Sequence, residues 1–169
     1  MFITDCFSDM IFFYFMFTHE QKRENLWILK NFVNWMRKRY GLKIDVIWSD
    51  NEMAWEETLH WLWTEAIDFK SSALCMQEQN DVAECSENVI MKKSWAMQIS
   101  SNFPHDLWMK IVNSAVYLHN QISREAQNWK TSYEIFFFII KNSLKKSQLV
   151  HLKVYECRAY VMTEDAQLK

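Results

Sequence analysis

Two carboxylates, Asp50 and Glu84, fall where separate structural elements could bring them together. Ile44, Val46 and Ile47 form a short β-branched run that leads into Ser49 and Asp50 and predicts a buried strand. Glu84 lies in the first turn of a helix predicted over residues 81–98. Carboxylates from different elements can share divalent cations, which take oxygen ligands and stabilise the attacking and leaving oxygens in phosphoryl transfer. The pair is therefore a candidate metal-dependent site.

Each acid also has a simpler explanation. Asp50 and Asn51 can close a strand as a turn, because their side chains bond the nearby backbone. Glu84 near a helix N-terminus interacts favourably with the helix macrodipole. Taken singly, these structural roles are sufficient, so a shared site depends on the elements that position the two residues.

The hydrophobic pattern predicts a mixed α/β sheet flanked by helices, without an internal repeat or a linker. The strands are expected at residues 1–5, 10–17, 43–48 and 67–70, with an extended piece near 152–162. The helices are expected at residues 21–39, 53–64, 81–98, 106–121 and 131–138. Gly41 ends the first helix, and residues 71–80 are predicted to form a loop.

Composition indicates one globular domain. The chain has 169 residues, of which 50% are hydrophobic and 24% are charged, enough to bury a core. Its net charge of −2 does not indicate a nucleic-acid or membrane partner, so any basic surface must be local. The apolar run MIFFYFMF, residues 10–17, is too short to span a bilayer.

The cysteines and histidines do not form a recognisable metal pattern. Cys6, Cys75, Cys85 and Cys157 lack paired close spacing, which favours free thiols over a zinc site or a disulfide framework. His119 and His151 lie in apolar stretches. Both are predicted to be packed or surface residues and not ligands.

Glycine and proline are unusually scarce. The chain has one of each, Gly41 and Pro104, and nine tryptophans. Average usage would give about 12 glycines and about 8 prolines. Because glycine adopts positive φ with the least strain, other residues are expected to occupy the left-handed turn positions.

Five segments in order resemble the integrase catalytic core of a Copia-type retrotransposon polyprotein, of the kind found in filamentous fungi. They are YGLKIDVIWSDNEM, QEQNDVAECSENVIM, FPHDLWMKIVNSAVYLHNQ, WKTSYEIFF and HLKVYECRAYVMTEDAQLK. The resemblance implies a ribonuclease H-like fold, with a five-stranded mixed sheet between helices. It also implies that residues 1–121 form the core, without its first strand, and residues 122–169 form a C-terminal extension.

The resemblance further implies DNA integration: cutting and joining of DNA ends with magnesium or manganese, in the nucleus, by a possible homo-oligomer without a membrane. It assigns Asp50 and Glu84 as catalytic metal ligands and Asn80, in the loop before the glutamate, as a DNA contact. Lys92 and Lys93 are candidate phosphate contacts, although a solvated helix surface is the better explanation of these lysines by themselves.

Departures from the family pattern favour an inactive remnant. The family's first catalytic aspartate lies upstream of FITDCFSDMIFFYF, and Asp5 and Asp9 fall at a different motif. Losing a metal ligand usually removes most of the rate. The expected function is a degenerate integrase core without activity; the alternative is a co-opted, non-catalytic nucleic-acid-binding module.

Several substitutions share one mutational direction. Trp48 and Cys85 stand where the family usually has arginine, Asp81 and Glu156 replace glycines, and Ser132 replaces a proline. Each change can arise by a C-to-T or G-to-A transition, which explains the glycine deficit and tryptophan excess together. If the two glycine positions need positive φ, restoring them is expected to stabilise the chain.

Overall fold

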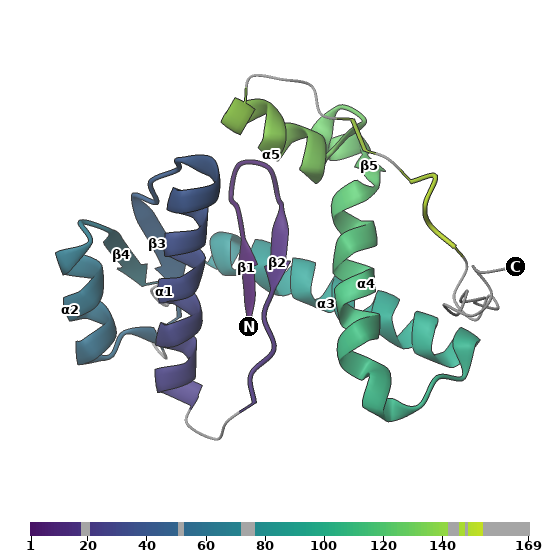
Figure 1. Ribbon diagram of the computed structural model, residues 1–169, viewed down its shortest axis with the longest axis horizontal. Helices are drawn as coiled ribbons and strands as arrows, with labels where there is room; N and C mark the ends of the chain where they lie inside the picture. Colours follow the sequence, from purple (N-terminus) through teal and green to yellow (C-terminus); the bar gives the residue numbers. More distant parts are fainter. Residues whose placement is uncertain (18–20, 51–52, 72–76, 142–145, 148, 154–169) are drawn as a thin grey trace, which may run out of the picture.

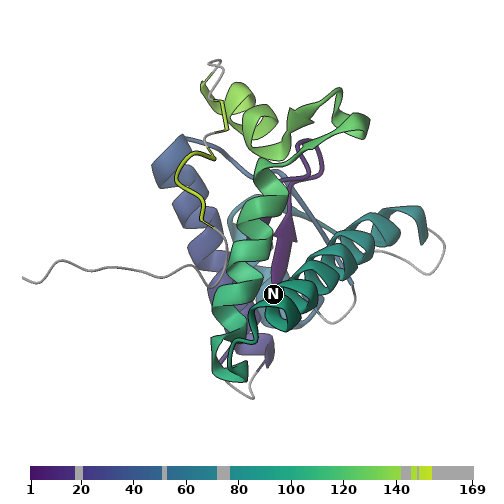
Figure 2. The same ribbon diagram turned by 90° about the vertical axis from the view of Figure 1, so that its right-hand side faces the viewer.

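The computed structural model describes residues 1–17, 21–50, 53–71, 77–141, 146–147 and 149–153. Helices and short strands alternate along this part of the chain (Figures 1 and 2). The strands are β1 Phe2–Thr4, β2 Ile11–Phe13, β3 Val46–Ser49, β4 Asp68–Ser71, β5 Ser123–Arg124 and β6 Lys130–Thr131. The helices are α1 Gln21–Tyr40, α2 Glu56–Thr64, α3 Gln77–Ser101, α4 Trp108–Gln121 and α5 Ser132–Lys141, with 3-10 turns at His105–Leu107 and Glu125–Gln127.

The strands form three two-stranded sheets and not the single five-stranded sheet that was expected. β1 and β2 are antiparallel, β3 and β4 are parallel, and β5 and β6 are antiparallel. Among the described residues, the hairpin and the parallel pair share no ladder. Side-chain packing joins them instead, because Met1 of the hairpin packs against the apolar cluster that covers β3. The mixed α/β class is confirmed, and the continuous sheet is a correction.

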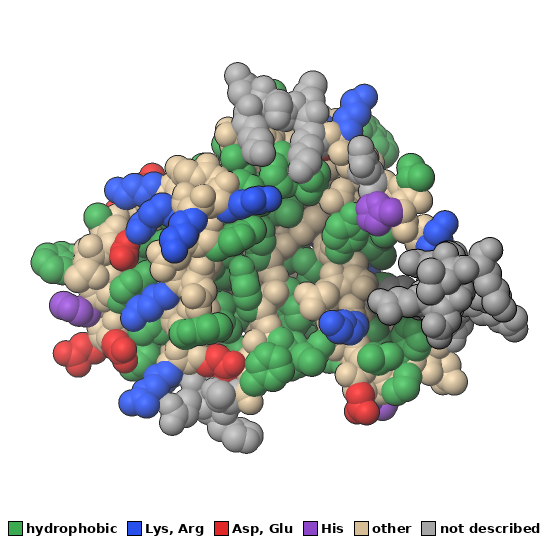
Figure 3. Space-filling model, viewed as in Figure 1, with side chains coloured by type: hydrophobic (Ala, Val, Ile, Leu, Met, Phe, Trp, Pro, Cys, Tyr) green, Lys and Arg blue, Asp and Glu red, His purple; other side chains and the backbone are tan. Residues whose placement is uncertain are grey.

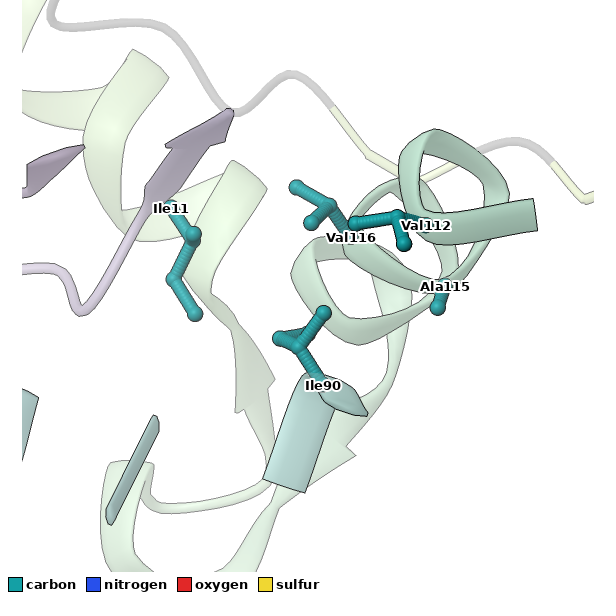
Figure 4. Close-up of a cluster of buried hydrophobic side chains, with 5 residues drawn as sticks. All are labelled: Ile11, Ile90, Val112, Ala115 and Val116. Carbon is teal, nitrogen blue, oxygen red and sulfur yellow. The ribbon is translucent and has the colours of Figure 1, made fainter. Parts of the chain in front are cut away.

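The β1–β2 hairpin lies between two groups of helices (Figure 1). Figure 4 shows the first side, where Ile11 extends from β2 toward Ile90 of α3 and meets side chains from α4. This cluster consists of Ile11, Ile90, Val112, Ala115 and Val116. Burying an aliphatic side chain of this size stabilises the fold by roughly 1.5–3 kcal/mol, so the hairpin and the two helices stabilise one another.

The opposite side of the hairpin packs on α1 and α5. Phe32 and Met36 of α1 meet Phe136 and Phe137 of α5, and Phe12 of β2 packs against them. The next strand residue therefore faces away from Ile11, as the two-residue repeat of a strand requires. The helical spacing in α1 predicted its buried face correctly, at Leu26, Leu29, Phe32, Val33 and Met36.

Asn120 of α4 completes the outer edge of β2. Its Oδ1 accepts a hydrogen bond from the Ile11 N–H at 3.0 Å, and its Nδ2 donates to the Ile11 carbonyl at 2.7 Å. Both residues are buried. A strand edge exposes a donor and an acceptor that need partners when water is excluded, and one amide side chain supplies both.

The glycine shortage appears directly in the backbone. Asp9, Ala66, Asn102, Asn128 and Trp129 all adopt positive φ, between 49° and 61°. Gly41 has φ 68° after α1, where its N–H donates to the Arg37 carbonyl. Asparagine and aspartate tolerate this region, but alanine and tryptophan are strained there. The expectation that other residues would occupy left-handed turns is confirmed.

The loop predicted over residues 71–80 is partly wrong, because α3 begins at Gln77. Residues 72–76 lie outside the described residues. Asp81 therefore has helical backbone, and the expectation that it occupies a positive-φ site is wrong. Glycine at position 81 would weaken a helix interior by roughly 1 kcal/mol. Glu156 and the extended piece near 152–162 lie largely outside the described residues.

Replacing Asn120 with alanine is expected to lower the free energy of unfolding by about 2–4 kcal/mol, because the buried Ile11 N–H and carbonyl lose their partners. Chemical denaturation of purified protein measures the change. Asn113→Ala is the matched control, since Asn113 is exposed on the same helix and its loss should cost less than about 0.5 kcal/mol. Equal effects at both positions would contradict the role given to Asn120.

Replacing Ala66 with glycine is expected to stabilise the chain by about 0.5–1 kcal/mol. Ala66 follows α2 in the left-handed conformation, its N–H donates to the Trp63 carbonyl, and the Ile67 N–H donates to the Leu62 carbonyl. That pair of bonds forms a Schellman motif, whose left-handed position usually carries glycine. Thermal unfolding should show a higher melting temperature.

The control is Ala96→Gly, an exposed position inside α3. Glycine there should lower stability by roughly 1 kcal/mol. A fall in melting temperature for both variants would mean that the left-handed backbone at Ala66 imposes no strain.

Candidate functional site

Asp50 lies at the end of β3, as predicted, and its side chain is exposed. The Ser49 hydroxyl donates to Asp50 Oδ1 at 3.4 Å, and the Met53 N–H donates to the Asp50 carbonyl at 3.3 Å. The carboxylate is therefore accessible to an external ligand, and Asn51, the other residue of the expected turn, lies outside the described residues.

Glu84 and Asn80 both lie in the N-terminal part of α3. Glu84 is about two turns inside the helix and not in its first turn, because α3 starts four residues earlier than predicted. Asn80 belongs to the helix and not to a loop, which corrects that expectation. The side chains of residues 77–84 lie outside the described side chains, so the approach of Glu84 to Asp50 stays a prediction.

The described donors do not fit a metal centre. In the described parts of the chain, no three His, Cys, Asp or Glu side chains are arranged to hold a metal ion. Asp5 holds the hairpin turn, where its Oδ2 accepts from the Ser8 N–H and hydroxyl at 2.9 and 2.6 Å. Asp9 instead faces Arg124 and Gln127. Of the two magnesium ligands that the resemblance implies, Asp50 and Glu84, only Asp50 has a described side chain.

Trp48 occupies the exposed side of β3, two residues before Asp50. It is 42% exposed, and the Lys70 ammonium lies 4.8 Å from its ring centroid. The two residues are register partners across β3 and β4. A cation–π contact at an exposed site is worth about 0.5–1 kcal/mol, so part of the cost of exposing this ring is offset.

The two lysines predicted to contact DNA differ in their surroundings. Lys92 is exposed on α3, whereas Lys93 is half-buried against α4. Lys93 Nζ lies 3.3 Å from Nδ1 of His119. Lys92 can therefore reach a surface ligand by rotation of its side chain alone, whereas the contact with His119 holds the Lys93 side chain in a defined position.

Lys93, His119 and Arg124 form a cluster of basic groups, called the basic cluster below. Burial, reinforced by the charges of Lys93 and Arg124, lowers the pKa of His119 to about 4. Burial and the Arg124 charge also lower the pKa of Lys93. Lys93 and Arg124 therefore lie close enough to influence His119 electrostatically. His119 is neutral at pH 7 and can accept from Lys93.

Sequence reasoning missed the basic cluster. His119 was predicted to be packed or on the surface, and it is indeed buried at 5% exposure. No sequence pattern indicated a role for Arg124, because this residue lies in the two-residue strand β5 and far from Lys93 in the sequence. The helical spacing of α4 indicated that His119 lies next to the predicted buried stripe. The contact between Lys93 and His119 could not be predicted in this way, because it depends on how α3 crosses α4.

Comparison with known proteins gives a likeness in structure only, since no protein-family model and no curated sequence matches. The chain is similar to the HTLV-2 integrase catalytic core domain, solved with magnesium in a trimeric form, with TM-score 0.56 and 16% identity. That match covers 78% of this chain and 80% of the other. A chain of the simian T-cell lymphotropic virus intasome, solved with PP2A regulatory subunit B56 gamma, matches with TM-score 0.63 and 14% identity.

The chain has an integrase-core fold. The simian match covers 96% of this chain and 53% of the other, so the chain spans about half of that protein. The mixed α/β fold implied by the resemblance is thereby confirmed at the level of the integrase core. In the part of the chain that the structure describes, no helix combines the length and apolarity needed to cross a bilayer.

Stability is expected to fall as the pH drops from about 6.5 to about 4. His119 has a pKa of about 4 when folded and 6.5 as its ordinary value. The unfolded chain therefore binds the proton first, and the free energy of unfolding rises with pH across this window. The full shift corresponds to roughly 3 kcal/mol, present above pH 6.5 and lost toward pH 4.

Denaturation of the wild type and His119→Gln across this pH range measures the effect. The charges that face His119 are those of Lys93 and Arg124. The variant should show a smaller pH slope, whereas His60→Gln, an exposed control on α2, should keep the wild-type slope. Parallel slopes in all three proteins would contradict the assignment.

Proposed function

We propose that this chain is an inactive remnant of a Copia-type retrotransposon integrase core. The integrase-core fold supports the general class, and the ordered sequence motifs support the Copia type. The observation that carries the inactivity is the ligand set: among the described residues no three His, Cys, Asp or Glu side chains are arranged to hold a metal ion, and Asp50 is exposed at the end of β3. The resemblance supplies Glu84 as its one further partner.

A site limited to Asp50 and Glu84 explains why the chemistry would fail. Two-metal phosphoryl transfer relies on cations fixed around the reacting phosphate, and the protein's part is to hold their geometry. Asp50 and Glu84 provide less negative charge than a complete set, so magnesium or manganese would bind weakly. A functional chain of this family would meet element and target DNA in the nucleus as a homo-oligomer, and the remnant proposed here would not.

A co-opted nucleic-acid-binding module is the second candidate function. Figure 3 shows Lys and Arg side chains gathering over α1 on an otherwise mixed surface. The last turn of this helix carries Arg37, Lys38 and Arg39. A local basic surface binds phosphates without any catalytic residue and makes the affinity depend strongly on salt. This basic surface favours the co-opted module, because a remnant without function needs no DNA-binding surface.

The purified chain is expected not to nick or join DNA above background in magnesium or manganese. Strand-transfer and disintegration assays with labelled DNA ends measure this, run beside Asp50→Asn and Glu84→Gln. Activity that both substitutions abolish would overturn the proposal and mean that another acid completes the site. Activity that both variants keep would identify a contaminating nuclease.

Fluorescence anisotropy on the same preparations separates the two candidate functions. A co-opted module should bind labelled DNA, and its affinity should fall steeply as salt rises. A remnant should bind weakly at every salt concentration.

A further inference from the structure

We propose that the C-terminal part of the described chain is a latch that opens and closes over α4 while the rest of the fold stays intact. The latch consists of residues 146–147 and 149–153, which lie beside α4 (Figures 1 and 2). Two separate contacts fasten it to this helix. Neither contact involves Asp50 or Glu84, so the proposal does not depend on any integrase activity.

The inner fastening is Ser147, which joins the latch to the ends of two helices. Its hydroxyl donates to Oε1 of Gln121 at 2.5 Å and lies 3.3 Å from the Gln121 carbonyl, at the end of α4. Its N–H donates to Oε1 of Glu134 at 3.5 Å. The other carboxylate oxygen of Glu134 accepts from the Thr131 N–H at 3.0 Å and so caps α5. Ser147 is therefore tied to a buried glutamine and to a helix cap.

The outer fastening is a single contact between two rings. The Tyr117 hydroxyl and Nε2 of His151 are 2.9 Å apart, and the rings meet edge to face with their centroids 5.9 Å apart. Tyr117 precedes Gln121 by one turn, so both fastenings use the same face of α4. Because this contact is exposed to solvent, water competes for the hydrogen bond and its net contribution to stability is small.

The latch buries little apolar surface. Leu149 and Val150 are 44% and 94% exposed, and among the described residues the three buried clusters include no member of the latch. The Leu152 N–H donates to the Leu149 carbonyl at 2.9 Å, which folds the outer part into a turn of its own. Segments with few buried apolar contacts open at a much lower free energy than the whole fold. Opening the latch therefore breaks polar contacts and leaves the core in place.

The difference between the two fastenings sets the order of opening. Ser147 is half-buried and makes its contacts with both Gln121 and Glu134, whereas His151 is exposed and contacts Tyr117 alone. The outer part, residues 149–153, thus opens first and the inner end follows. Opening uncovers the Tyr117 hydroxyl and changes where the chain leaves α4. A partner that binds α4 at Tyr117 would shift the population toward the open state.

Amide hydrogen exchange, read by NMR at pH 7, tests the latch. In the wild type the Leu152 amide should exchange fastest, the Ser147 amide more slowly and the Ile11 amide, in the core, most slowly. Tyr117→Phe keeps the ring and removes the hydroxyl, so Leu152 should exchange about three- to tenfold faster while Ser147 and Ile11 stay unchanged. The matched control is Tyr40→Phe on α1, which should leave the Leu152 rate as in the wild type.

A second variant tests the inner fastening. Ser147→Ala removes the hydroxyl contacts with Gln121, so the amides of residues 147 and 152 should both exchange about three- to tenfold faster. The Ile11 amide should keep its wild-type rate, which also shows that each variant remains folded.

Three outcomes would overturn the proposal. One is a wild-type Leu152 amide that exchanges as fast as in a free peptide of residues 146–153, because the latch would then not be closed. Another is an equal Leu152 rate in Tyr117→Phe and Tyr40→Phe. The third is joint acceleration of Leu152 and Ile11 in either latch variant, because the segment would then open only when the whole chain unfolds.

Discussion

The pair of hydrogen bonds between Asn120 and the backbone of Ile11 holds the fold together. β2 is the hairpin strand whose two faces contact different groups of helices, and its outer edge would otherwise be a buried, unsatisfied donor and acceptor. With that edge satisfied, Ile11 can pack between α3 and α4 while Phe12 packs against α1 and α5. The same anchoring places His119, the preceding residue of α4, against Lys93 of α3.

The hydrophobic core and the left-handed turns differ in how well they tolerate amino-acid substitution. Apolar positions accept substitution when volume and pattern are kept, so the three buried clusters persist. Left-handed turns have no such tolerance, and the positive φ of Ala66 and Trp129 remains as strain. Directional mutation away from glycine would therefore leave a chain that folds with reduced stability.

The candidate sites differ in what positions them. Asp50 needs only the end of a strand and a turn, both readable from a β-branched run followed by Asp and Asn. The basic cluster needs three elements in register: α3 for Lys93, α4 for His119 and β5 for Arg124. The hairpin tip contributes too, because Asp9 faces Arg124 and Gln127 donates to the Ser8 carbonyl. A shift of the hairpin would carry Asp9 away from Arg124 and so change the balance of charge in the basic cluster.

The sequence by itself determined the order of the five helices and of the first four strands, the buried face of α1, the strand end at Asp50 and the use of non-glycine residues in left-handed turns. These follow from local periodicity and from the conformational range of single residues. Only the tertiary structure decided the division into three small sheets and the long α3 that contains Asn80 and Glu84. It also decided the meeting of Lys93, His119 and Arg124, because helix crossings bring together charges that no local pattern connects.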